Sequence, residues 1–371
     1  MRPGCHIVLT ARASADIMPY IVKSRPIKKA ATAKRKDDHI RINLEEDVEF
    51  RGLTTGLERL QFEHQALPEL DLARIDCSVT VFGKVLRAPL MVSSMTGGTR
   101  NAQRINRVLA TAAGQAGIAM GLGSMRVALE SQASAASFEL RKYAPQLLLF
   151  ANLGAPQLNY GYGVEHCRRA VALSGADGLI LHFNPLQEAV QPEGDTNFSG
   201  LLRKVEAVCR ALAADGVPVI AKEVGWGFSE RACKQLAAAG VAAIDVAGAG
   251  GTSWSKVEMH RAPNPALARV AAAFDDWGIP TVQALHNARR GAPDTLVFAS
   301  GGLRSGVDCA KCIALGATLA GTARPFLQAA VVSEEAVDAT INEFIQQLRI
   351  SMFCAGAADI AALQRTPLQA R

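Results

Sequence analysis

The sequence has few aromatic residues and no long apolar run. Aromatic residues make up 5% of its 371 positions, whereas nucleic-acid-binding surfaces usually combine a basic face with interleaved aromatic side chains. The longest apolar stretches, residues 146–153 and 178–183, are much shorter than the roughly 20 residues that a transmembrane helix needs. We therefore expect neither nucleic-acid binding nor insertion into a membrane.

The eight cysteines lack the regular spacing of a disulfide framework. A chain of this length buries a sufficient core without such bonds, and a reducing cytoplasm is the expected compartment. Cys309 and Cys312 form a C-x-x-C pair inside the apolar helical run 306–315. We interpret them as small core residues and not as an exposed redox pair.

Acidic residues are almost absent from the first 34 positions, where Asp16 stands against seven Lys and Arg residues. This segment therefore accounts for the formal net charge of +6, and the remaining chain is nearly neutral. A transit peptide can have this composition, but we favour a disordered basic leader at residues 1–34. Residues 35–371 are then expected to form one domain.

From Pro89 onward, short apolar runs alternate with longer stretches of helical periodicity, which is typical of repeated βα units. Eight such runs close a barrel, so the predicted fold class is an α/β TIM (β/α)₈ barrel. The predicted strands are residues 89–93, 118–121, 147–151, 178–181, 218–221, 243–246, 296–299 and 318–321.

Polar or glycine-rich turns follow every predicted strand. In a barrel these turns meet at the C-terminal face, where active sites are built. Residues 253–285 are longer than a usual βα connection, and we expect this insertion between strands 6 and 7 to carry an extra helix over the site. Residues 35–88 precede the first strand and are interpreted as an N-terminal flap.

Two turns are typical of a phosphate site. Residues 300–304 (SGGLR) and 321–324 (GTAR) follow strands 7 and 8, where barrels commonly bind phosphate through backbone N–H groups and a helix N-terminus. Lys222 ends an apolar strand and needs an anionic partner there. A reduced flavin would supply one, although tight turning alone and an ion pair of Lys222 with Glu223 or another carboxylate are the alternatives.

A dense polar cluster leaves strand 4 at residues 182–188 (HFNPLQE). Together with Glu193 and Asp195 it suits Mg²⁺, which takes one or two carboxylates and completes its shell with water and phosphate. A single His or Glu here would more often be a core residue or a helix-capping carboxylate. The charged run Arg35-Lys36-Asp37-Asp38-His39 would by itself indicate only a solvated surface.

Read together, these motifs resemble the type 2 isopentenyl-diphosphate isomerases from about residue 35 to the C-terminus. The motifs are R35-K36-x-x-H39, S94-M95-T96-G97-G98, H182-x-N184-x-x-Q187-E188, K222-E223-x-G225, D245-x-x-G248-x-G250-G251-T252 and S300-G301-G302-x-R304. The resemblance implies interconversion of isopentenyl and dimethylallyl diphosphate with reduced FMN, Mg²⁺ and NADPH as reductant. It also implies a homo-tetramer or homo-octamer.

The resemblance assigns a role to each site residue. It places His182, Asn184 and Gln187 at the reacting centre and Glu188 on Mg²⁺. The substrate diphosphate would contact Arg35, Lys36, His39, Arg126 and Gln187. FMN would contact Ser94, Met95, Thr96, Ser124, Asn152, Lys222, Thr252, Gly301, Gly302, Arg304, Ala323 and Arg324.

The chain departs from the family pattern at Met125, which stands where the family has glutamine, and at Pro185-Leu186, which stiffens the loop before Gln187. We expect these changes to affect substrate details. The alternative function is an FMN-dependent 2-hydroxy-acid oxidase on the same barrel, but no His-Gly-Gly-Arg pairing follows strand 7. A non-catalytic flavin-binding barrel is a further alternative.

Overall fold

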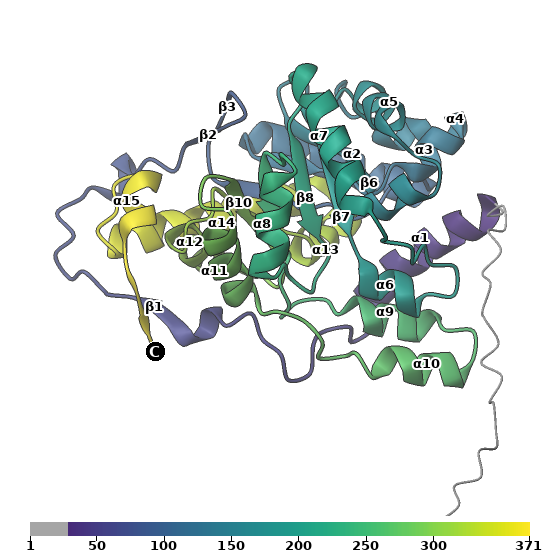
Figure 1. The fold of residues 1–371 in the computed structure, drawn as a ribbon. Helices are drawn as coiled ribbons and strands as arrows, with labels where there is room; N and C mark the ends of the chain where they lie inside the picture. Colours follow the sequence, from purple (N-terminus) through teal and green to yellow (C-terminus); the bar gives the residue numbers. More distant parts are fainter. Residues whose placement is uncertain (1–28) are drawn as a thin grey trace, which may run out of the picture.

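A closed barrel of eight parallel strands forms the centre of the molecule (Figure 1). The computed structural model describes residues 29–371, so the predicted leader lies mostly outside it. The barrel strands are β4 (Leu90–Val92), β5 (Ala119–Gly121), β6 (Leu148–Gly154), β7 (Gly178–Phe183), β8 (Val219–Glu223), β9 (Ala243–Asp245), β10 (Leu296–Ala299) and β11 (Leu319–Thr322). The predicted TIM (β/α)₈ fold is confirmed, with each strand close to its expected position.

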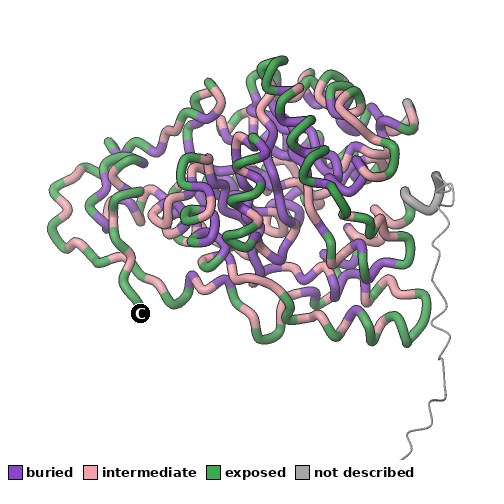
Figure 2. The backbone as a smooth tube through the Cα atoms, viewed as in Figure 1, coloured by how far each residue is buried: buried purple, intermediate pink, exposed green. Residues whose placement is uncertain are grey.

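The strands are apolar on both faces because each face packs against a different layer. In β6, Leu148 and Phe150 join the core inside the barrel, whereas Leu149 and Ala151 pack outward against the helices. This two-sided burial is typical of parallel strands and explains the near-continuous apolar runs in the sequence. Figure 2 shows the buried strands surrounded by helices with exposed outer faces.

Helices connect successive strands around the barrel. The main ones are α2 (Arg100–Ala116), α5 (Val164–Ser174), α7 (Leu201–Ala214), α8 (Glu230–Ala238), α11 (Thr281–Gly291), α12 (Gly306–Ala314), α13 (Arg324–Val332) and α14 (Glu334–Cys354). Local signals set their ends: the Thr99 hydroxyl accepts from the Ala102 N–H where α2 begins, and Gly117 ends it with φ 67°. Cys309 and Cys312 are fully buried in α12, which confirms their interpretation as core residues.

A β-hairpin closes the N-terminal end of the barrel. Strands β2 (Val79–Val81) and β3 (Lys84–Leu86) pair antiparallel. Phe82 at the turn lies with its ring centroid 6.0 Å from that of Phe150 and 6.2 Å from that of Phe298. The barrel is therefore a filled core at this end, and any site must lie at the other end.

Additional segments gather beside the C-terminal end of the barrel (Figure 1). They are α1 (Lys29–Glu45) at the start of the flap, the short helices α3 (Arg126–Glu130), α4 (Gln132–Ala135) and α6 (Pro185–Val190), and α9 (Trp254–Arg261) with α10 (Pro265–Ala272) in the insertion between β9 and β10. The predicted insertion thus contains helices. Helix α1 begins at Lys29, so the last six residues assigned to the leader continue into the helix that carries Arg35, Lys36 and His39.

The C-terminal segment pairs with the flap on the outside of the barrel. Strand β12 (Leu368–Ala370) pairs antiparallel with β1 (Leu60–Phe62) of the flap, and α15 (Ile360–Arg365) precedes it. None of the helices within residues 29–371 combines the length and apolarity needed to cross a membrane.

Candidate active site

A cavity of about 680 Å³ opens at the C-terminal ends of the barrel strands. All residues to which the family resemblance assigns a role line it: Arg35, Lys36, His39, Ser94, Met95, Thr96, Ser124, Arg126, Asn152, His182, Asn184, Gln187, Glu188, Lys222, Thr252, Gly301, Gly302, Arg304, Ala323 and Arg324. Glu193 and Asp195, which the sequence adds to the predicted Mg²⁺ cluster, do not line it. The structure therefore brings distant motifs to one place, as the barrel topology predicts.

The cavity has two chemically different halves. The glycine-rich half is formed by residues 93–96, Lys222, 248–252, 300–304 and 321–324, which end β4 and β8 to β11. The charged half is formed by Arg35, Lys36, His39, Arg126, His182, Asn184, Gln187, Glu188 and Gln191. Ser124, which follows β5, and Asn152, which lies in β6, are located between the two halves.

Glycine is required where the turns of the glycine-rich half pack on one another. Gly301 and Gly302 have backbone φ values of 100° and 76°, which residues other than glycine rarely adopt. A Cβ on Gly301 would lie 2.0 Å from the carbonyl oxygen of Gly248. The two turns therefore pack backbone to backbone and still line the cavity. These glycines thus allow the tight turns and also leave the backbone accessible to a ligand.

Three hydroxyl groups after β4 lack partners. The oxygens Ser93 Oγ, Ser94 Oγ and Thr96 Oγ1 are buried and form no hydrogen bond with the described residues. Buried polar atoms are usually satisfied, and an unsatisfied group in a native structure calls for a missing partner. A ligand with hydrogen-bonding edges, such as an isoalloxazine, fits this wall of the cavity.

Two arginines lie in the turns after β10 and β11, at one end of the glycine-rich half. Arg304 Nη2 lies 2.6 Å from Glu49 Oε2, and Arg324 Nη1 lies 2.8 Å from Glu49 Oε1. Arg324 also begins α13, and a helix N-terminus favours an anion. One carboxylate of the flap thus occupies the position between two guanidinium groups that would suit a phosphate.

Lys222 is buried and ion-paired. Its Nζ lies 2.7 Å from Asp245 Oδ2 and donates to Ser300 Oγ at 3.0 Å. Lys222 therefore forms an ion pair, as the alternative interpretation predicts, and the partner carboxylate is Asp245 and not Glu223. The Glu223 carboxylate accepts instead from the backbone N–H groups of residues 224–226, and burial raises its pKa to about 7 against these favourable bonds.

His182 is held as a neutral imidazole. Burial, reinforced by the charges of Lys222 and Lys36, lowers the pKa of His182 to about 4. Its Nδ1 lies 2.7 Å from Asn152 Oδ1. Because a carbonyl oxygen can only accept, Nδ1 carries the proton and Nε2 remains an acceptor. His182 can therefore accept a hydrogen bond in the cavity but does not carry a charge near neutral pH.

Glu188 organises the loop after β7. Its Oε1 accepts from Asn184 Nδ2 at 2.9 Å, and its Oε2 accepts from Gln191 Nε2 at 2.5 Å and from the Asp195 N–H at 2.6 Å. Burial raises the pKa of Glu188, with the Asp195 N–H opposing that shift. Asn184 Oδ1, beside this carboxylate, is buried without a partner. An amide oxygen next to a carboxylate is a suitable ligand pair for Mg²⁺.

No larger metal cluster accompanies Glu188. Within residues 29–371, no group of three or more His, Cys, Asp or Glu side chains is arranged to hold a metal ion. A cation here would therefore need most of its ligands from water or from a bound phosphate, as is usual for Mg²⁺. Asp195, which the sequence places in the same cluster, is instead bonded to Arg126 Nη1 at 2.7 Å and to Gln157 Nε2 at 3.0 Å.

Helix α1 brings three basic groups to the charged half. Burial, with a contribution from Arg35, lowers the pKa of Lys36 to about 7, and its Nζ donates to the Ser124 carbonyl oxygen at 3.0 Å. Burial also lowers the pKa of His39. The run at residues 35–39 is therefore not merely a solvated surface, because its basic side chains line the cavity.

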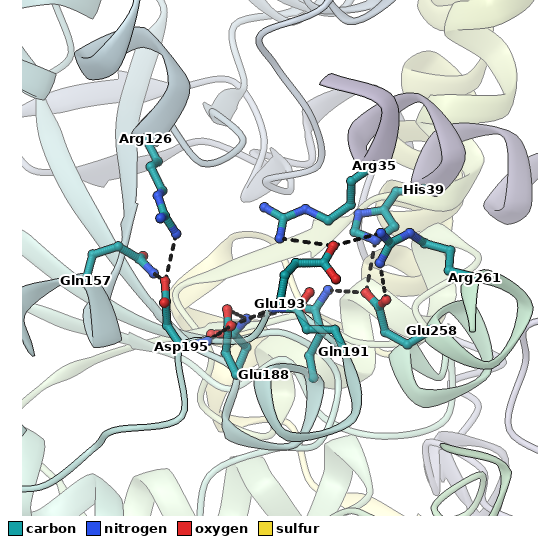
Figure 3. Close-up of polar contacts among 12 residues, drawn as sticks. Arg35, His39, Arg126, Gln157, Glu188, Gln191, Glu193, Asp195, Glu258 and Arg261 are labelled. Atoms are coloured by element: carbon teal, nitrogen blue, oxygen red, sulfur yellow. Dashed lines mark hydrogen bonds and ion pairs between the residues drawn. The ribbon is translucent and has the colours of Figure 1, made fainter. Parts of the chain in front are cut away.

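Glu258 connects the insertion to the flap and to the loop after β7 (Figure 3). Its Oε1 accepts from His39 Nε2 at 3.0 Å and from Gln187 Nε2 at 3.1 Å, and Arg261 Nη1 donates to its Oε2. Burial opposes ionisation, but the His39 and Arg261 contacts outweigh it and keep the pKa of Glu258 below its usual value. The Gln187 amide is thereby held in one orientation.

A second carboxylate bridges the same segments. Glu193 Oε1 accepts from Arg261 Nη2 at 2.9 Å and lies 3.9 Å from Arg35 Nη1 (Figure 3). Sequence reasoning assigned no role to Glu49, Glu258 or Arg261, because they lie in connecting segments without a motif. Only their contacts in the folded chain identify them.

Met125 does not face the cavity. Its side chain is fully buried in the apolar core, and its backbone precedes the first turn of α3. Residue 125 is turned into the core, and Ser124 and Arg126 line the cavity on either side of it. The predicted effect of Met125 on substrate details would therefore have to be indirect.

Comparison with known proteins identifies the family. The chain matches the FMN-dependent dehydrogenase family over residues 29–152 and 195–370. It is 54% identical to an isopentenyl-diphosphate delta-isomerase of Nostoc sp., over 91% of this chain and 95% of that protein. It is 50% identical to an isopentenyl-diphosphate delta-isomerase of Rickettsia bellii, over 91% of this chain and 97% of that protein.

Solved structures show the same fold at lower identity. A flavocytochrome b2 variant with pyruvate bound has a TM-score of 0.66 and 17% identity, over 89% of this chain and 82% of that chain. A mandelate oxidase variant has a TM-score of 0.64 and 18% identity, over 92% of this chain and 99% of that chain. With the sequence comparisons, these findings show that the chain belongs to the FMN-dependent dehydrogenase family and, within it, to the isopentenyl-diphosphate delta-isomerases.

Proposed function

We propose that this protein interconverts isopentenyl diphosphate and dimethylallyl diphosphate in isoprenoid synthesis, with reduced FMN and Mg²⁺. One observation carries the proposal: a wall with unsatisfied hydroxyls and Lys222 shares a single cavity with Arg35, Lys36, Arg126 and Glu188. A flavin fits the first set of groups and a magnesium diphosphate fits the second.

The glycine-rich half would hold FMN. The residues that would contact it are Ser94, Met95, Thr96, Ser124, Asn152, Lys222, Thr252, Gly301, Gly302, Arg304, Ala323 and Arg324. When bound and reduced, FMN supplies a proton donor and acceptor beside the substrate. The hydroxyls after β4 would bond to the edges of its ring, and the turns after β10 and β11 would bind its phosphate through backbone N–H groups.

The charged half would hold the diphosphate. Arg35, Lys36 and Arg126 would bind its oxygens, with His39 and Gln187 beside them, and Glu188 with Asn184 Oδ1 would bind the Mg²⁺ that shares them. A bound anion would favour the charged form of Lys36 and so oppose burial and Arg35, which lower its pKa. The diphosphate would thus fix the hydrocarbon end of the substrate over the glycine-rich half.

The reaction moves one proton onto the terminal alkene carbon and removes one from the carbon next to the CH₂–O group, so it is redox-neutral. Protonating an unactivated alkene needs exclusion of water and precise placement of the acid. The neutral His182, the oriented Gln187 amide and Asn184 would line the reacting centre. Their role would be to place the substrate and to avoid a competing charge near the developing cation.

Other features of the proposal concern cofactor supply and assembly. NADPH would reduce FMN before turnover. A cytoplasmic location agrees with the seven described cysteines, all of which are free. We also propose a homo-oligomer, a tetramer or octamer, with the flap near the subunit contacts.

An anaerobic assay tests the proposal. The protein is reconstituted with FMN and Mg²⁺, reduced with dithionite or NADPH, and mixed with ¹³C-labelled isopentenyl diphosphate while NMR follows the methyl signals. We expect an equilibrium mixture containing dimethylallyl diphosphate, and no conversion with oxidised FMN or with EDTA. Unchanged substrate in a preparation whose spectrum shows bound, reduced FMN would refute the isomerase. Hydrogen peroxide release with lactate or glycolate would favour the oxidase alternative.

A further inference from the structure

Lys222, Asp245 and Ser300 form a buried triad beneath the cavity. Lys222 and Asp245 are register partners on β8 and β9, and Ser300 follows β10. Lys222 Nζ lies 2.7 Å from Asp245 Oδ2, Ser300 Oγ donates to Asp245 Oδ1 at 2.5 Å, and Lys222 donates to Ser300 Oγ at 3.0 Å. Every member therefore contacts the other two.

The members of the triad differ in their access to the cavity. Lys222 and Ser300 line it, whereas Asp245 does not and has no exposed surface. Asp245 thus lies behind Lys222, within the barrel wall, and cannot touch a ligand. Any effect of its charge on a cavity ligand passes through the position and net charge of the Lys222 group.

Asp245 therefore offsets part of the positive charge that Lys222 presents to the cavity. A lone buried lysine would exert its full charge on a flavin and would favour the reduced, anionic form. With a carboxylate 2.7 Å behind it, the lysine acts more as a dipole than as a free cation, because charges interact strongly in a low-dielectric interior. Glu223 does not contribute in this way, since its carboxylate is bonded to the 224–226 backbone.

We propose that Asp245 is a positioning residue that fixes Lys222 and offsets its charge, and thereby limits the preference of the site for reduced over oxidised FMN. The inference rests on the proposed binding of FMN.

The decisive measurement is the affinity of the Asp245→Asn variant for FMN in both oxidation states. Asparagine keeps the shape and can still accept from Lys222, but it removes the negative charge. We expect the ratio of reduced to oxidised FMN affinity to rise about tenfold, equivalent to a midpoint potential raised by about 30 mV for two electrons. A merely structural role would weaken both affinities and leave their ratio unchanged.

Asp177→Asn is the matched control. Asp177 is also a paired aspartate at a barrel strand, with Lys84 Nζ at 2.8 Å and Arg141 Nη2 at 2.6 Å. It directly precedes β7, at the end of the barrel away from the cavity. We expect its substitution to leave the ratio of the two FMN affinities unchanged, whatever it does to stability.

Ser300→Ala provides a second variant if Asp245→Asn does not fold. It keeps the ion pair but removes the hydroxyl that donates to Asp245, so the carboxylate charge acts more fully on Lys222. We expect the affinity ratio to fall about twofold to threefold, opposite in sign to Asp245→Asn. An unchanged ratio in either folded variant, or a shift against the stated sign, would overturn the inference. Failure of the wild-type protein to bind FMN would instead refute the proposed function.

Discussion

The glycine-rich half of the cavity is built from the barrel itself, whereas the charged half depends on segments added to the barrel. Lys222 and the 300–304 turn lie at strand ends, where neighbouring strands fix their positions. Arg35, Lys36 and His39 lie on α1 of the flap, where His39 bonds to Glu258 of the insertion and Arg35 pairs with Glu193 of the loop after β7. We therefore expect that substitutions can alter the proposed cofactor binding and the proposed substrate binding separately.

The largest effect is expected from Lys222→Met, which alters the glycine-rich half at its centre. The change leaves Asp245 buried without its ion partner, which typically costs about 3–5 kcal/mol of folding stability, and it removes the cation facing the flavin. We expect FMN affinity to fall about 100-fold or more. Fluorescence quenching of FMN and urea unfolding measure the two effects.

Lys234→Met is the control for that variant, because Lys234 is exposed on α8. Its FMN affinity and unfolding midpoint should match those of the wild type. Retention of normal FMN affinity by Lys222→Met would break the comparison, since the barrel strands would then not determine cofactor binding.

Glu188→Gln should separate the two halves. The amide keeps the size of the side chain but loses the charge that would bind Mg²⁺, so we expect isomerase activity to fall about 100-fold while FMN affinity stays unchanged. Activity is measured across a Mg²⁺ titration, and FMN is measured by its absorption. Glu165→Gln, on the exposed start of α5, is the control. Full activity of Glu188→Gln would remove Glu188 from the metal site.

The pH dependence of anion binding should be confined to the charged half. The pKa of Lys36 is about 7 in the unliganded site, so the ammonium is present below pH 7 and is lost as the pH rises above it. A bound anion would favour the protonated form. We therefore expect the affinity for inorganic pyrophosphate, relative to that of Lys36→Met, to fall by up to about tenfold per pH unit above pH 7.

Isothermal titration calorimetry between pH 6 and 8.5 measures the pyrophosphate affinity of the wild type and of Lys36→Met. The ionisation of pyrophosphate affects both affinities equally, so it cancels in their ratio. A ratio that does not change with pH would show that Lys36 keeps its proton throughout. FMN affinity should show no such dependence on residue 36, because Lys36 belongs to the other half.

The smallest effect is expected at Glu49, a flap residue that contacts the glycine-rich half although α1 of the same flap contributes to the charged half. Its carboxylate pairs with Arg304 and Arg324, where it would compete with a phosphate for the same guanidinium groups. We expect Glu49→Gln to bind FMN about two- to fivefold more tightly, since partly exposed ion pairs contribute about 0.2–1 kcal/mol.

Glu46→Gln is the matched control, because Glu46 directly follows α1 and its carboxylate lies 4.0 Å from Arg41 Nη1, away from Arg304 and Arg324. Riboflavin, which lacks the phosphate, should bind equally to wild type and Glu49→Gln. Weaker FMN binding by Glu49→Gln would show that the carboxylate supports the cofactor site and does not compete with its phosphate.

The sequence predicted the glycine-rich half well because its signals are local. A strand followed by Gly301-Gly302 or by Lys222 can be recognised in a few consecutive residues, and the barrel topology then places these strand ends together. The ion pair between Lys222 and Asp245 was less accessible, since it depends on the register of β8 against β9.

The charged half was harder to predict because its contacts join segments far apart in the chain. Glu258 is 219 residues from His39, and no periodicity or motif marks it. The direction of the Met125 side chain was equally hidden, because it depends on how the backbone enters α3. The cluster at residues 182–188 could be recognised from its residues, and the run at residues 35–39 through the family resemblance, but their partners could only be found in the folded chain.

The aromatic hairpin turn at Phe82 also bears on how ligands reach the cavity. Since Phe82 packs on Phe150 and Phe298, the far end of the barrel is filled, and a ligand cannot cross the barrel from one side to the other. The proposed flavin and diphosphate would then both have to enter from the C-terminal end of the strands.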